Sequence, residues 1–157
     1  MFSFFSSFLS SDNLSQKINF LESGFQQPSS IPTLTYLDNP SSITYSVNEI
    51  LNRYTIRKNL ANNPTTDTTP SAKDIVSSLK NNSYIQPSLV MRGFYLIWNI
   101  HNRSGNGNAL QIQTGTGVFI NGGNPFITVN DGTIKAIQLQ ITNAEEGQEE
   151  VFLTEFN

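Results

Sequence analysis

The sequence contains a single histidine, His101, and no cysteine. Catalysis by a histidine needs a nucleophile or an orienting carboxylate within hydrogen-bond reach. The sequence neighbours of His101, Ile100 and Asn102, supply neither group, and a partner remote in sequence stays open. The lack of cysteine excludes disulfides, thiolate zinc sites and cysteine nucleophiles. We therefore predict a plain histidine at a strand end, no catalytic residue and no enzyme.

Acidic residues could serve calcium binding or glycoside hydrolysis. Calcium loops alternate Asp and Asn ligands around a glycine. In residues 145–150 the acidic residues come as adjacent pairs, and adjacent residues of a strand project to opposite faces. Glycosidases hold two carboxylates on one face of a cleft. Asp67 and Asp74 better suit turn and helix-cap roles. We predict a solvated hairpin tip at 145–150 and no bound metal or cofactor.

Two glycine pairs and the single tryptophan are the remaining candidates for ligand binding, to a phosphate and to a sugar respectively. The runs 105–107 (Gly-Asn-Gly) and 115–117 (Gly-Thr-Gly) do not open a helix, so they cannot place a phosphate on a helix N-terminus. They read as turn glycines with positive φ. Trp98 could stack on a sugar, but it shares the phase of Leu96 and Ile100, which predicts core packing.

From Tyr84 onward, apolar and polar residues alternate with the period of strands. Turn residues separate these runs about every 8–12 residues, as in a sandwich or barrel. Strands joined by tight turns pair in antiparallel fashion. Residues 84–157 therefore predict an antiparallel β-sandwich with strands at 94–100, 110–113, 118–120, 126–129, 137–142 and 151–156.

Two helix start signals precede this β-domain. Ser46 and Glu49 have the spacing of a capping box, and Ser71 with Asp74 repeats that spacing after Pro70. Apolar residues follow both signals at helical spacing. Residues 46–83 therefore predict two short capped helices and a linker.

The pattern of residues 1–45 predicts an extended N-terminal docking arm. Pro28, Pro32 and Pro40 remove backbone donors and favour extended conformations before them. A signal peptide is the alternative for the first nine residues, but basic residues before the apolar run and a small-x-small cleavage site are missing. A solvated phenylalanine cluster aggregates unless a partner covers it. The predicted contact residues are Phe2, Phe4, Phe5, Phe8, Leu9, Ile31, Leu34 and Tyr36.

Charge is scarce along the whole chain. Charged residues make up 13% and the formal net charge is −3. Nucleic-acid binding needs clustered Lys and Arg, and here the basic residues are scattered, so we predict no nucleic-acid partner. No apolar run approaches the roughly 20 residues of a membrane span. The polar surface consists of Asn, Ser, Thr and Gln, which suits contacts with other proteins.

Several stretches of the sequence follow the pattern of one recurring module. Residues 94–118 resemble the pattern F-x-I-x-N-x-S-x-x-x-N-x-L-x-I-x-x-G-x-G-V, and residues 139–151 resemble V-x-V-T-N-x-x-x-G-x-E-A-V. The stretches before them are Tyr45-Ser46-Val47-Asn48-Glu49-Ile50-Leu51, then Ile56-Arg57-Lys58, then the run Thr66-Asp67-Thr68-Thr69-Pro70-Ser71-Ala72-Lys73-Asp74-Ile75-Val76. From Tyr45 to the C-terminus, the chain thus resembles a recurring module in virion proteins of large double-stranded DNA viruses.

The resemblance implies a jelly-roll-like sandwich and a minor capsid or capsid-associated protein. Other capsid proteins would be its partners, and it would be made in the host cytoplasm and located in the virion. The thin core of 84–157 favours a homo-oligomer, with a trimer as one candidate. The alternative is the trimeric receptor- or carbohydrate-binding head of a viral fibre, in which loops 102–108 and 121–124 would contact the ligand.

Overall fold

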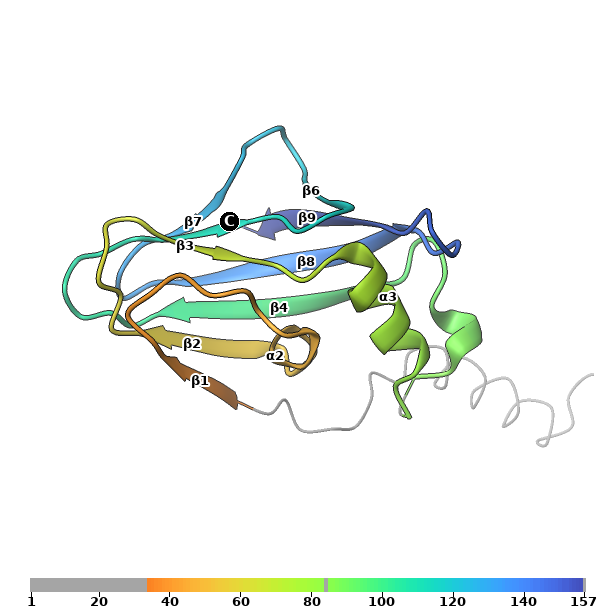
Figure 1. Ribbon diagram of the computed structural model, residues 1–157, viewed down its shortest axis with the longest axis horizontal. Helices are drawn as coiled ribbons and strands as arrows, with labels where there is room; N and C mark the ends of the chain where they lie inside the picture. The colour runs from red at the N-terminus through yellow and green to blue at the C-terminus, as the bar shows by residue number, and fades with distance from the viewer. Residues whose placement is uncertain (1–33, 84, 157) are drawn as a thin grey trace, which may run out of the picture. The chain divides into compact units, whose positions relative to one another are not determined.

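The computed structural model, which describes residues 34–83 and 85–156, contains two β-sheets. The larger sheet has the strand order β1-β2-β4-β8-β9-β6 and the smaller has β3-β5-β7. Figure 1 shows β1, β2, β4, β8 and β9 side by side in that order. A mainly β fold is thus confirmed. The strands are β1 Leu34–Asp38, β2 Tyr54–Lys58, β3 Thr65–Thr68, β4 Tyr95–Asn102, β5 Leu110–Gln113, β6 Val118–Ile120, β7 Ile127–Val129, β8 Ile134–Asn143 and β9 Glu150–Phe156.

Both sheets are mixed, which corrects the prediction of an antiparallel fold. The pairs β1–β2, β2–β4, β3–β5 and β6–β9 are parallel. The other pairs of described strands, β4–β8, β5–β7 and β8–β9, are antiparallel. The prediction assumed that strands joined by a short turn pair with each other. From β2 to β8, however, each successive strand lies in the other sheet, so these connections carry the chain between sheets.

The β-structure begins earlier than predicted. Part of the range assigned to the arm, 1–45, forms the edge strand β1, and the range assigned to helices, 46–83, also contains β2 and β3. Because β2 pairs with β4, the predicted boundary before residue 84 does not separate the sheet from what precedes it. Local pattern missed β2 because Thr55, Ile56 and Arg57 are consecutive and all buried, so the strand shows no alternation.

Both predicted helices are confirmed. The first, α2 (Val47–Leu51), begins with a complete capping box, in which the Glu49 amide donates to Ser46 Oγ at 3.3 Å and the Ser46 amide donates to Glu49 Oε2 at 2.6 Å. The second, α3 (Ala72–Lys80), begins with the Asp74 amide donating to Ser71 Oγ at 3.1 Å. A short 3₁₀ helix, η1 (Pro87–Leu89), follows.

One apolar cluster joins the two sheets and both helices. Trp98 lies within it, 0% exposed, and packs edge-to-face against Tyr45 with ring centroids 5.0 Å apart. The predicted core role of Trp98 is therefore confirmed. The cluster consists of Tyr45, Ile50, Leu60, Ala72, Ile75, Val76, Leu79, Val90, Leu96, Trp98, Ile100, Leu110, Ile112, Val118, Ile127, Val129, Ile137, Leu139, Ile141, Val151 and Leu153.

The predicted turn glycines are of two kinds. Gly105, Gly107 and Gly117 have positive φ values of 70°, 80° and 74°, as expected. Gly115 differs, because a Cβ placed on it would lie 2.5 Å from the Thr69 carbonyl oxygen. The close approach of two backbones, rather than positive φ, requires glycine at this position.

Candidate interaction surface

His101 lies on β4, on the side of the larger sheet away from the core. Its register partners are Ile56 on β2 and Ile134 on β8, so aliphatic residues flank it on both neighbouring strands. Burial lowers the pKa of His101 below its ordinary value, and the charge of Arg103 lowers it further, against the raising effect of a backbone hydrogen bond with Gly132. This environment favours a neutral imidazole.

The acidic cluster lies at the tip of the β8–β9 hairpin, where residues 145–148 are all exposed, which confirms the predicted solvated tip. Beside it is an open depression of about 640 Å³ whose lining includes Lys80, Arg92, Glu145 and Glu150. The Lys80 ammonium donates to the Ala144 carbonyl at 2.7 Å, so it holds the hairpin in place. Within residues 34–83 and 85–156, no group of three or more metal-binding side chains comes together.

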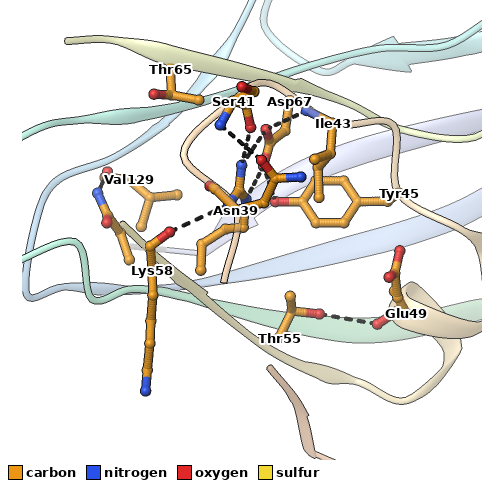
Figure 2. Close-up of polar contacts among 12 residues, drawn as sticks. Asn39, Ser41, Ile43, Tyr45, Glu49, Thr55, Lys58, Thr65, Asp67 and Val129 are labelled. Carbon is orange, nitrogen blue, oxygen red and sulfur yellow. Dashed lines mark hydrogen bonds and ion pairs between the residues drawn. The ribbon is translucent and has the colours of Figure 1, made fainter. Parts of the chain in front are cut away.

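Asp67 does not serve the predicted turn role but forms a buried ion pair with Arg57 (Figure 2). Arg57 Nε donates to Asp67 Oδ2 at 2.6 Å and Nη2 donates to Oδ1 at 3.1 Å, which is a bidentate arrangement. Tyr45 Oη donates to Oδ2 at 2.7 Å and the Ile43 amide to Oδ1 at 3.0 Å. Asp74, by contrast, does cap its helix, as predicted.

The remaining donors of Arg57 bind backbone carbonyls. Nη1 donates to Asn39 O at 2.6 Å and Nη2 to Ser41 O at 2.7 Å. Burial lowers the pKa of Arg57, but the hydrogen bond and charge of Asp67 outweigh it and raise the pKa above its usual value. Burial, reinforced by Asp67, raises the pKa of Tyr45 well above its usual value. The cluster thus fastens residues 39–45 between β2 and β3.

The strand register shows which side chains of the larger sheet project away from the core. Paired residues project to the same side, and alternate residues of a strand project to opposite sides. We call this side the outer face and the side that contributes to the core the inner face. The rows of outer-face partners are Leu34–Tyr54–Asn99–Ala136–Phe156, Tyr36–Ile56–His101–Ile134, Ile97–Gln138–Thr154 and Tyr95–Gln140–Phe152–Phe119.

Apolar and aromatic residues dominate these rows, and no Asp, Glu, Lys or Arg occurs in them. Charges occur at the ends of the strands. Asp38 and Lys58 pair at the end of β1 and β2, and Lys58 Nζ lies 5.1 Å from the centre of the Tyr36 ring. Glu150 is the first residue of β9, two residues before Phe152. Several of the side chains are open to solvent: Tyr95 58%, Tyr36 56%, Ile134 51%, Phe156 49%, Phe119 45% and Leu34 42%. Apolar surface gathered in this way marks interaction sites in soluble proteins.

The predicted arm contacts are only partly within the described residues. Leu34 and Tyr36 lie there, on the edge strand β1, and both belong to the outer face. Phe2, Phe4, Phe5, Phe8, Leu9 and Ile31 lie outside the described residues. The strand register therefore makes Leu34 and Tyr36, two of the predicted contact residues, part of a larger surface.

Sequence reasoning missed most of that larger surface. The sequence does contain a sign of this surface: three runs in which consecutive residues are all apolar, so that both sides of the strand carry apolar side chains. These runs are Phe94-Tyr95-Leu96-Ile97, Val118-Phe119-Ile120 and Val151-Phe152-Leu153. A strand with one solvated face alternates apolar and polar residues. Failure of that alternation indicates that both faces of the strand have apolar neighbours or are available for them.

The loops predicted for ligand contact differ from each other. In the loop 102–108, Asn106 Nδ2 and Asn108 Nδ2 both donate to Leu60 O, at 2.8 and 2.7 Å. Asp131 accepts from the amides of Gly105 and Gly107, which lowers its pKa to about 2. These polar groups hold the loop itself, whereas residues 121–124 are all exposed.

Comparison with known proteins gave no match among models of protein families, curated proteins or solved structures. Across the described part of the chain, no helix has both the length and the apolar character needed to cross a bilayer.

Proposed function

We propose that this chain is a non-enzymatic structural protein of a virion, a minor capsid or capsid-associated component held to other capsid proteins through its outer face. The observation that carries the proposal is that face, on which exposed tyrosine, phenylalanine, leucine and isoleucine side chains stand without an intervening charge. Covering such a surface removes apolar area from water without desolvating an ion. The resemblance of residues from Tyr45 onward to a virion module supports the same function.

The fold fits this proposal in its general form. We propose to describe the two sheets as a β-sandwich, because a single apolar cluster is shared between them. The strand order and the parallel pairs give no support to the jelly-roll form of that sandwich. A homo-oligomer, of which a trimer is one form, would cover the outer face further. The chain would be made in the host cytoplasm and carried in the virion.

Particle incorporation tests the proposal. We would replace Tyr95→Ser and Ile134→Lys together, since both side chains are more than half exposed and their loss leaves the core intact. Thr128→Lys is the matched control, an exposed position on β7 in the smaller sheet. Wild-type chain and control should sediment with purified particles, and the double variant should be depleted at least about tenfold. Full incorporation of a folded double variant would contradict the proposal.

A viral-fibre head that binds a receptor or a carbohydrate is the second candidate. The exposed rings of Tyr36 and Tyr95 favour it, because aromatic rings offer apolar faces with a polar tip. The exposed loop 121–124 could add polar contacts. A glycan array probed with the full chain separates the candidates: binding that Tyr95→Ser abolishes supports the head, and no binding to any glycan counts against it.

A further inference from the structure

We propose that the phenylalanine-rich segment 1–9 of one copy of this chain docks on the outer face of a second copy. The proposal deepens the assembly function above and rests on it. It names the occupant of the face as the part of the chain that carries Phe2, Phe4, Phe5, Phe8 and Leu9. Each copy would then both donate a segment and accept one, a head-to-tail contact that forms a ring or a chain of copies.

The chemistry of the segment matches that of the face. From Met1 to Ser11 the sequence contains no charged side chain, only apolar residues and serines. The outer-face rows likewise hold no Asp, Glu, Lys or Arg. Docking one on the other therefore leaves no ion buried without a partner, the condition that most often opposes burial. The serines and the face's Asn, Gln and Thr side chains can hydrogen-bond each other.

The size of the segment is adequate for a stable contact. Aromatic side chains bury about 150–250 Å² each, so four phenylalanines bury about 600–1,000 Å². A stable interface buries about 800 Å² on each partner. The face spans six strands about 4.8 Å apart, or about 24 Å across, which accommodates several rings.

The position of β1 lets the segment reach a neighbour. Its first residue, Leu34, is itself part of the outer face and lies on the edge strand of the larger sheet. Residues 10–33 connect the segment to β1, and about 24 extended residues span up to about 80 Å. Pro28 and Pro32 bias the part nearest β1 towards extended backbone. A tether of this length reaches the outer face of a second copy.

Complementation between two variants tests the proposal in solution with full-length chains. The segment variant carries Phe4→Ser and Phe5→Ser and keeps its outer face. The face variant carries Ile134→Lys and keeps its segment, with Tyr95→Ser as a second face variant if the first folds poorly. Association is measured by light scattering during size-exclusion chromatography, and folding by circular dichroism. Thr128→Lys is the control for a charge placed elsewhere on the surface.

Wild type and Thr128→Lys should associate, each variant alone should be monomeric, and an equimolar mixture should give a heterodimer. The mixture restores one intact segment and one intact face on different copies. A wild type that stays monomeric, a segment variant that still associates, or a mixture that does not associate would each overturn the proposal. Particle incorporation of the segment variant distinguishes the two ideas: if incorporation persists while complementation fails, the assembly function stands and the segment exchange does not.

Discussion

The two faces of the larger sheet are built from the same strands and face opposite environments. On β4, Leu96, Trp98 and Ile100 project into the core, while Tyr95 and Ile97 project outward. The inner face contributes Arg57 to a buried ion pair with Asp67 of the smaller sheet, and two hydrogen bonds join the two side chains. The outer face contains no charged residue between its rows and leaves large apolar side chains exposed. Hydropathy alone therefore does not say which face of this sheet is the core. The smaller sheet and the helices decide it.

The largest loss of unfolding free energy should come from breaking the buried ion pair between Arg57 and Asp67. Asp67→Asn removes the charge that Arg57 needs and leaves that guanidinium buried at 0% exposure. Removing one partner of a buried pair typically costs about 3–5 kcal/mol of unfolding free energy. Urea denaturation would measure it. Asp74→Asn, an exposed acid at the start of α3, is the control and should change stability by less than about 1 kcal/mol.

A loss below about 1 kcal/mol for Asp67→Asn would contradict the structural role of the cluster. The double variant Arg57→Met/Asp67→Leu adds a sharper test. It removes both charges at once, so it should recover part of the stability that the single variant loses. No recovery would indicate that the hydrogen bonds to Asn39 and Ser41 carry the stabilisation instead.

The same substitution at two positions of β8, one on each face of the sheet, should change the unfolding free energy by different, smaller amounts. Ile137 on β8 is 0% exposed in the core, and Ile134 is 51% exposed on the outer face. Ile137→Val deletes a buried methylene and should cost about 0.5–1.5 kcal/mol. Ile134→Val should change unfolding free energy by less than about 0.5 kcal/mol in the monomer. Thermal denaturation at low protein concentration checks both, and equal losses would mean that the outer face is covered.

The sequence predicted elements better than their pairing. Strands β4 to β9 and both helices follow from alternation and capping signals carried by neighbouring residues, such as Ser46 with Glu49. Pairing depends on contacts between distant segments, and nothing local says that β2 lies between β1 and β4. A turn looks the same whether the next strand pairs with the last or crosses to the other sheet. That ambiguity produced the wrong antiparallel prediction.

The candidate surface was predicted only at its margin, for related reasons. The sequence singles out Leu34 and Tyr36 because they are apolar residues between the prolines of the predicted arm, and they are outer-face residues. Tyr95, Phe119 and Phe156 were assigned to strands without a side, since one strand gives no information on what covers it. The ion pair of Arg57 with Asp67 has no sequence signal either, because its partners lie on different strands of different sheets.

The smallest effect concerns His101, the one residue in the outer-face rows that titrates near neutral pH. Its pKa is lowered by burial and by Arg103, so below the unfolded value of about 6.5 the unfolded chain binds more protons. Its contribution to stability is therefore present above that value and is lost as pH falls through the folded pKa. NMR titration of the single imidazole should give a value below 6.5, and Arg103→Gln should raise it. Replacing His101→Gln should remove the corresponding pH dependence of the melting temperature between about pH 5 and 7, whereas an unchanged profile would place the titrating group elsewhere than the outer face.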